Sequence, residues 1–266
     1  MEDRMTISLA QIEITHDDEE ENFDKMKTYT TEAARRGSDL VLFPETWASG
    51  GVSKRVTGRA VRLGEGIHAR VADLAKEHHI YIAGTNVTRL ENGACGNVLT
   101  LYAPDGNLAA QYTKIHLFRL MDEHKHLAAG EQLAMVDMPW GKTALSICYD
   151  LRFPEVYRAY ALAGARVVLV PASWPHPRLS HWLTLLRARA IENQVFIVAC
   201  NRTGNQGGAD YFGHSCVIDP WGEMLVEGGA CETLLTVTIN LSVIEQVRAK
   251  IPVFSDRNPA AYTFLE

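Results

Sequence analysis

Short apolar segments rich in Val and Ile alternate along the chain with longer amphipathic stretches. Apolar runs bounded by turn residues predict buried strands, and apolar positions three and four residues apart predict helices. The predicted strands are 7–12, 40–43, 81–85, 98–102, 108–113, 134–136, 143–148, 167–170, 196–200, 215–218 and 234–239. The predicted helices are 22–36, 67–78, 154–163, 180–193 and 242–250. Alternating strands and helices, with hairpins between some strands, indicate a layered α/β fold with sheets face to face and helices outside.

The chain of 266 residues, 47% of them hydrophobic, can bury one large core. It contains no Pro/Ser-rich linker, no low-complexity run and no repeat of solenoid period. We therefore predict one domain, residues 1–266. Its last part, residues 251–266, has apolar residues without periodicity, and we expect this tail either to wrap a partner subunit or to pack on its own chain.

The charge and the cysteine content mainly exclude certain partners and cellular locations. The net charge is −6, with both signs mixed along the chain, which disfavours a nucleic-acid stripe or a polybasic membrane helix. The five cysteines are an odd number without a C-x-x-C pair, and the first residues lack the apolar segment of a secretory signal. These features predict free thiols, a cytoplasmic location, and neither nucleic acid nor membrane as a partner.

Three reactive side chains come at or directly after predicted strands. Glu45 follows the strand 40–43 and a proline, Lys114 follows the strand 108–113, and Cys148 ends the strand 143–148 before a predicted helix. Ligands of open α/β layers bind where strands end, so the three could share one pocket. Composition alone leaves open that Cys148 is a core thiol and that the two charges lie on the surface.

Together the three residues would suit attack on a carbonyl carbon. A free thiol is mostly protonated at neutral pH, and Glu45 could take its proton and later deliver it to a leaving amine. Lys114 and the backbone N–H of Tyr149 could stabilise the negative oxygen of a tetrahedral intermediate. This chemistry needs neither a metal nor a cofactor.

The sequences around these positions resemble the nitrilase, or carbon–nitrogen hydrolase, superfamily. Residues 42–46, LFPET, resemble its glutamate motif; residues 112–117, YTKIHL, its lysine motif; and residues 146–155, SICYDLRFPE, its cysteine motif. The three occur in family order, and the resemblance extends from about residue 7 to residue 251. It implies an α/β fold of the nitrilase type, a four-layer α-β-β-α sandwich, which pairs into a homodimer of eight layers.

The resemblance also implies a second glutamate between the lysine and the cysteine. Glu123 occupies that place, and it is expected to orient Lys114 and help position the substrate. The proline that usually precedes the final glycine of this motif is Ala129 here, which weakens the match at Glu123.

Within the superfamily, residues 172–178, 181–182, 185–194 and 200–204 look most like the omega-amidase branch. That branch removes ammonia from the terminal amide of short dicarboxylic monoamides such as 2-oxoglutaramate, and its bacterial members are associated with methionine salvage. Branches acting on deaminated glutathione or N-carbamoyl compounds share the core motifs, so they remain alternatives. A non-catalytic binding member that kept the fold is a third.

A substrate of the omega-amidase kind carries a carboxylate remote from its amide, which calls for a cationic clamp. Arg152 and Arg178 are the candidates, with Trp174 and Tyr149 as pocket walls. Two alternatives stay open: Arg152 could pair with Glu155 or Asp150 instead, and Arg178 could be solvated. The histidines at 116, 124 and 126 match no standard zinc spacing, so we predict no metal site.

Overall fold

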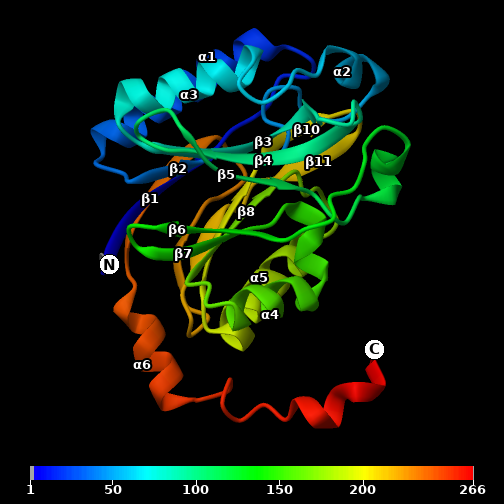
Figure 1. Cartoon of the computed structure of the whole chain (residues 1–266). Helices are drawn as coiled ribbons and strands as arrows, with labels where there is room; N and C mark the ends of the chain where they lie inside the picture. Colours follow the sequence, from blue (N-terminus) through cyan, green and yellow to red (C-terminus); the bar gives the residue numbers. More distant parts are fainter. Residues whose placement is uncertain (1–2, 266) are drawn as a thin grey trace.

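Two β-sheets lie face to face between pairs of helices in the computed structural model, which describes residues 3–265 (Figure 1). Within this range each sheet has six strands, in the orders β14-β1-β2-β3-β4-β5 and β13-β12-β9-β8-β7-β6. The four-layer α-β-β-α sandwich of the sequence analysis is confirmed. Met1, Glu2 and Glu266, the ends of the predicted domain and tail, lie outside the described residues.

The first sheet comprises β1 (Arg4–Gln11), β2 (Leu40–Leu42), β3 (Tyr81–Arg89), β4 (Cys95–Tyr102), β5 (Leu108–Thr113) and β14 (Thr233–Asn240). The second comprises β6 (Ala134–Met138), β7 (Gly141–Leu145), β8 (Val167–Ala172), β9 (Phe196–Asn201), β12 (Cys216–Ile218) and β13 (Met224–Glu227). The hairpin of β10 (Thr203–Gln206) and β11 (Ala209–Phe212) stands apart from both sheets.

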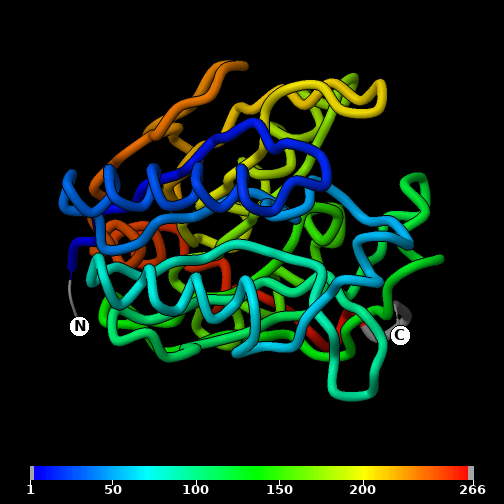
Figure 2. Tube along the Cα trace, turned by 90° about the horizontal axis from the view of Figure 1, so that it is seen from above, coloured from blue at the N-terminus to red at the C-terminus, as the bar shows by residue number. Residues whose placement is uncertain are grey.

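Helices α1 (Glu19–Arg35) and α3 (Gly66–His78) run side by side over the first sheet (Figure 2). Helices α4 (Pro154–Leu162) and α5 (Leu179–Asn193) cover the second sheet, while α2 (Lys54–Arg59) and α6 (Ser242–Lys250) lie outside the layers (Figure 1). Helix α1 begins three residues earlier than predicted, because Asp18 caps it and accepts a hydrogen bond from the Glu21 N–H.

Strand β2 shows how the apolar pattern builds these layers. Leu40 and Leu42 belong to the core between the sheets, whereas Val41 and Phe43 belong to the core under α1 and α3. Successive side chains of a strand point to opposite faces, so a fully apolar strand is buried on both sides. The central strands of each sheet run parallel: β1, β2 and β3 in one, β7, β8 and β9 in the other.

Parallel pairing brings several strand ends to one edge of the sandwich. Glu45 follows β2, Ser173 follows β8, and the Glu45 N–H donates to the carbonyl of Ala172 at 3.3 Å, which joins the two sheets at this edge. Lys114 follows β5, which runs in the same direction as β3 because β4 is antiparallel to both. The strand ends predicted to share a pocket therefore do so.

One prediction about the fold is wrong, and several short elements were missed. Cys148 does not end a strand: β7 stops at Leu145, and Cys148 begins the 3₁₀ helix η3 (Cys148–Arg152) with φ at +45°. The strands β10, β11 and β13 and helix α2 were not predicted, since their short segments show no sustained periodicity.

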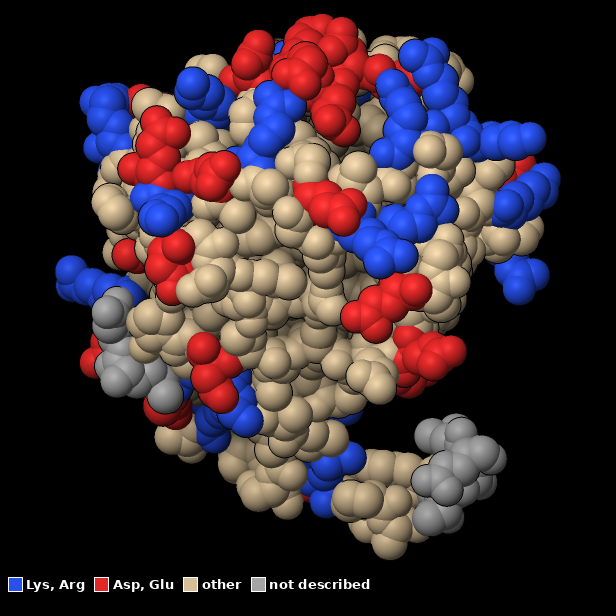
Figure 3. Space-filling view, turned by 45° about the horizontal axis from the view of Figure 1, so that its top comes forward, with Lys and Arg blue, Asp and Glu red and all other residues tan. Residues whose placement is uncertain are grey.

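No helix within residues 3–265 is long and apolar enough to cross a membrane. Acidic and basic side chains lie close to one another in the upper part of the face in Figure 3, whereas its centre and lower part carry few charges.

Candidate active site

Lys114 lies at the centre of a buried cluster of charges. It is fully buried, and its Nζ donates to Glu45 Oε1 at 2.7 Å and to Glu123 Oε1 at 2.9 Å. Two nearby carboxylates are what a buried ammonium requires, because an unpaired charge in the interior is very costly. Burial is the largest single influence on the pKa of Lys114 and lowers it. The charges of Glu45 and Glu123 together outweigh burial and raise this pKa well above its usual value. Lys114 is therefore a permanent cation.

Glu45 is held by hydrogen bonds from both sheets. Asn97, on β4, donates from Nδ2 to Oε1 at 2.8 Å, and the Ser173 N–H donates to Oε2 at 2.9 Å. The Ser173 hydroxyl also donates to the Glu45 carbonyl. The carboxylate is thus fixed before any substrate arrives, as a general base must be.

Glu123 is the second carboxylate on Lys114, as the resemblance implies. Its Oε2 accepts the Phe118 N–H at 2.7 Å, which closes the loop between them. Burial, and then the charge of Glu45, raise the pKa of Glu123 against the effect of Lys114. Gly130, which follows Ala129, packs on the Thr113 carbonyl, where a Cβ would clash, and its N–H donates to the Lys114 carbonyl at 2.9 Å.

Cys148 completes the cluster. Burial raises the pKa of its thiol well above the usual value, and the charge of Glu45 adds to this while Lys114 opposes it. The resting group is therefore a thiol beside a carboxylate rather than a free thiolate. Such a pair can attack a carbonyl if the thiol passes its proton to the carboxylate as the new bond forms.

Asp150 fixes the turn that carries the nucleophile. It is fully buried and accepts from the Ile147 N–H at 2.9 Å, from the Tyr112 hydroxyl at 2.8 Å and from His116 at 2.8 Å. Two of these donors belong to the chain around Lys114, so the carboxylate ties the cysteine turn to the lysine strand. It supports the left-handed backbone of Cys148, which costs energy in a residue other than glycine.

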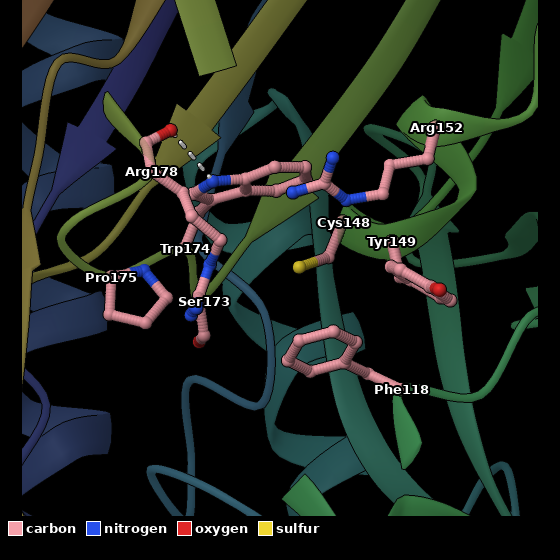
Figure 4. A pocket seen from close by; sticks show the side chains of 8 residues that line it. All are labelled: Phe118, Cys148, Tyr149, Arg152, Ser173, Trp174, Pro175 and Arg178. Carbon is pink, nitrogen blue, oxygen red and sulfur yellow. Dashed lines mark hydrogen bonds between the residues drawn. The ribbon is translucent and has the colours of Figure 1, made fainter. Parts of the chain in front are cut away.

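A cavity of about 320 Å³ opens onto this cluster, lined by Glu45, Lys114, Glu123 and Cys148 among others. A narrower part continues past the nucleophile between Tyr149, Arg152, Trp174 and Arg178 (Figure 4). Every site residue predicted from the sequence therefore lines one of these two connected parts.

The two arginines lie against aromatic rings at the narrow end. The Arg152 guanidinium carbon is 4.8 Å from the centre of the Trp174 ring, and Arg178 lies 5.7 Å from that of Phe118. Over residues 3–265 Arg152 forms no ion pair with Glu155 or Asp150, so the first alternative is wrong; its one hydrogen bond, at 3.3 Å, is to His181. Figure 4 shows both side chains beside the space into which the Cys148 sulfur points.

Three residues that hold the two carboxylates were not predicted from the sequence. Asn97 and Ser173 donate to Glu45, and Phe118 donates to Glu123. None of the three is a reactive residue of the motifs. The signal available was position, since Ser173 follows β8 as Glu45 follows β2.

Comparison with known proteins agrees with this geometry. Residues 6–249 match the family model of the carbon–nitrogen hydrolases. The chain belongs to the carbon–nitrogen hydrolase family. It is a nitrilase-superfamily enzyme acting on amides, as the sequence resemblance predicted.

Three relatives illustrate the match. The 2-oxoglutaramate amidase of Bacillus subtilis (strain 168) is 37% identical over 253 residues, which is 95% of this chain and 97% of the relative. A CN-hydrolase superfamily protein of Xanthomonas campestris, with an arsenic adduct in its active site, superposes with a TM-score of 0.90 at 34% identity, covering 97% of this chain and 98% of the other. A glutamate-to-glutamine mutant of an amidase from Nesterenkonia sp. AN1 carries the acetamide moiety of fluoroacetamide covalently on its active-site cysteine. It superposes with a TM-score of 0.83 at 28% identity, covering 91% of this chain and 92% of the other.

Proposed function

We propose that this hydrolase cleaves the terminal amide of a short 2-oxo or dicarboxylic acid monoamide, such as 2-oxoglutaramate, to the acid and ammonia. The observation that carries the proposal is the cavity itself: the thiol–carboxylate–lysine cluster lies beside a narrow end that holds Arg152 and Arg178. A cationic end next to a nucleophile suits a substrate with an amide at one end and a carboxylate at the other. The likeness to a 2-oxoglutaramate amidase supports the same substrate.

The first half of the reaction forms a thioester. Cys148 passes its proton to Glu45 while its sulfur attacks the amide carbon, and Lys114 together with the Tyr149 N–H stabilises the oxygen that becomes negative. The Tyr149 N–H is available because the first N–H groups of a helical turn have no acceptor within it. Glu45 then gives the proton to the nitrogen as the carbon–nitrogen bond breaks, and ammonia leaves.

The second half releases the acid. Glu45 takes a proton from water, the hydroxide attacks the thioester carbon, and the same two donors stabilise the oxygen again. The carbon–sulfur bond breaks and the sulfur regains a proton from Glu45. Glu123 holds Lys114 in place throughout. The cysteine adduct of the Nesterenkonia amidase supports a nucleophilic cysteine in the covalent step.

Ammonia release from 2-oxoglutaramate tests the proposal, with the Cys148→Ala variant alongside. We expect turnover by the native protein and a loss of at least about 10³-fold in the variant. The variant should keep its melting temperature, because losing one sulfur atom leaves only a small cavity. Turnover retained in Cys148→Ala would refute the mechanism.

A panel of succinamate, deaminated glutathione and an N-carbamoyl amine tests the choice of substrate. Preference for either of the last two would assign the protein to another branch of the family. No turnover of any of them by folded protein would favour a non-catalytic binding role.

We further propose that the protein acts in the cytoplasm, in methionine salvage, as a homodimer to which the tail 251–266 contributes. Exposed apolar side chains near that tail support the assembly: Ile191 on α5, Trp221 after β12 and Ile251 after α6. The mass in solution of the full chain and of a chain ending at residue 250 tests it. A full chain that is a monomer would contradict the dimer.

A further inference from the structure

Tyr211, on β11, lies in the wall of the wide part of the cavity, next to the segment that lines the narrow part. Its side chain lines the wide part together with Cys148, and its backbone forms a bridge with Pro175, which lines the narrow part. The β10–β11 hairpin thus lies beside the segment that carries Arg178.

The hydroxyl of Tyr211 is available to a ligand. The residue is only 7% exposed, and within residues 3–265 its hydroxyl forms no hydrogen bond. Because the residue lines the cavity, this O–H can donate to an acceptor on a molecule bound there. A phenol O–H at neutral pH can donate to a neutral carbonyl oxygen.

A buried arginine fixes the orientation of the Tyr211 ring. The guanidinium carbon of Arg202 lies 4.3 Å from the ring centre, within the range of a cation–π contact. Arg202 is itself fully buried and donates to the carbonyls of Gly50 at 3.0 Å and Ile14 at 2.8 Å. The hydroxyl is therefore presented at a set position rather than by a mobile side chain.

Tyr211 lies beside both the nucleophile and the arginine end. It lines the wide part of the cavity with Cys148, and Pro175, to which its backbone is bridged, lines the narrow part with Arg178. Burial raises the pKa of Tyr211, which keeps its O–H protonated as a hydrogen-bond donor. In 2-oxoglutaramate the 2-oxo group is next to the carboxylate, on the side towards the amide.

We propose that Tyr211 determines specificity by donating a hydrogen bond to the 2-oxo oxygen of the substrate, between the carboxylate at Arg178 and the amide at Cys148. The inference rests on the proposed function and adds to it a residue that recognises the oxo group. Sites built to hydrogen-bond a substrate oxygen reject analogues without it, because their own polar group then stays unpaired.

Glutaramate, which has a methylene in place of the 2-oxo group, supplies the test. The ratio of kcat/KM for 2-oxoglutaramate to kcat/KM for glutaramate is measured for the native protein and for Tyr211→Phe. We expect the ratio to fall at least about tenfold in the variant, since only the oxo substrate loses a hydrogen bond. An unchanged ratio would overturn the inference, whether both activities fall or neither does.

Tyr102→Phe is the matched control. Tyr102, on β4, is also buried with an unpartnered hydroxyl, but it lies in the core under α1 and α3. We expect its ratio to equal the native one, and an equal fall there would also overturn the role of Tyr211. A native protein that does not cleave 2-oxoglutaramate would refute both proposals, whereas an active native protein with an unchanged ratio in Tyr211→Phe would refute only this one.

Discussion

Replacing Lys114 by methionine tests the buried charge cluster most directly. Methionine has nearly the same length and fills the same space, so the main change is the loss of a cation that bonds Glu45 at 2.7 Å and Glu123 at 2.9 Å. All three side chains are at least 90% buried. The variant therefore leaves two carboxyl groups facing each other in the interior without a counter-charge.

The expected loss of stability follows from that arrangement. Removing one partner of a buried ion pair costs about 3–5 kcal/mol, because the remaining charge stays uncompensated. For a domain of this size such a loss is a large part of the whole free energy of unfolding. A proton is the only replacement for the cation, so the loss must depend on pH.

The sign of that dependence can be worked out from Glu123. Burial and Glu45 already raise its pKa in the native protein, and Lys114 opposes them, so removing Lys114 raises it further. The folded variant then binds more protons than the unfolded chain, and its stability falls as the pH rises towards the raised pKa, by up to about 1.4 kcal/mol per pH unit for one proton. The deficit relative to native protein should be smallest near pH 5 and largest near pH 8.

Urea denaturation at several pH values measures this deficit. Lys142→Met is the control: Lys142 is an exposed residue of β7, and its replacement should change stability by no more than about 0.5 kcal/mol at any pH. A Lys114→Met deficit below about 1 kcal/mol, or one independent of pH, would show that the two carboxyls do not depend on this cation.

Two further substitutions test the groups around the cluster. Arg178→Met should lower kcat/KM for 2-oxoglutaramate at least about tenfold more than for uncharged butyramide, because a charge-assisted hydrogen bond to the carboxylate is lost; an equal effect on both amides would exclude the clamp. Asn97→Leu should lower kcat about tenfold with little change in KM, since Glu45 loses the donor at 2.8 Å that orients it for proton transfer; a change confined to KM would contradict this.

The charged cluster could be predicted because its signals are local. Glu45 and Cys148 follow apolar runs, Lys114 follows a predicted strand, and the surrounding motifs occur in family order. The two-faced burial of β2 likewise follows directly from its unbroken apolar sequence. These features depend on neighbours within about ten residues, which a single sequence displays.

The missed parts depend on contacts between distant segments. Asn97 acts on Glu45 across 52 residues, and Ser173 does so across 128. Cys148 was placed in a strand because the apolar run continues to Ile147, yet Asp150 turns the backbone by accepting bonds from Tyr112 and His116, more than 30 residues away. The β10–β11 hairpin was missed because its glycines break the alternation.

In the proposed mechanism, chemistry and specificity are carried by different parts of this fold. The proposed reacting groups come from the segments that follow β2, β5 and β7, which the core between the sheets holds in place, so substitution there disturbs packing as well as catalysis. Arg178 and Tyr211 come instead from the connection after β8 and from the β10–β11 hairpin, which neither sheet includes. Connections tolerate change better than packed strands. Relatives with other amide substrates should therefore differ at these two segments and agree at the strand ends, and a change of substrate is best sought by exchanging the hairpin and the connection together.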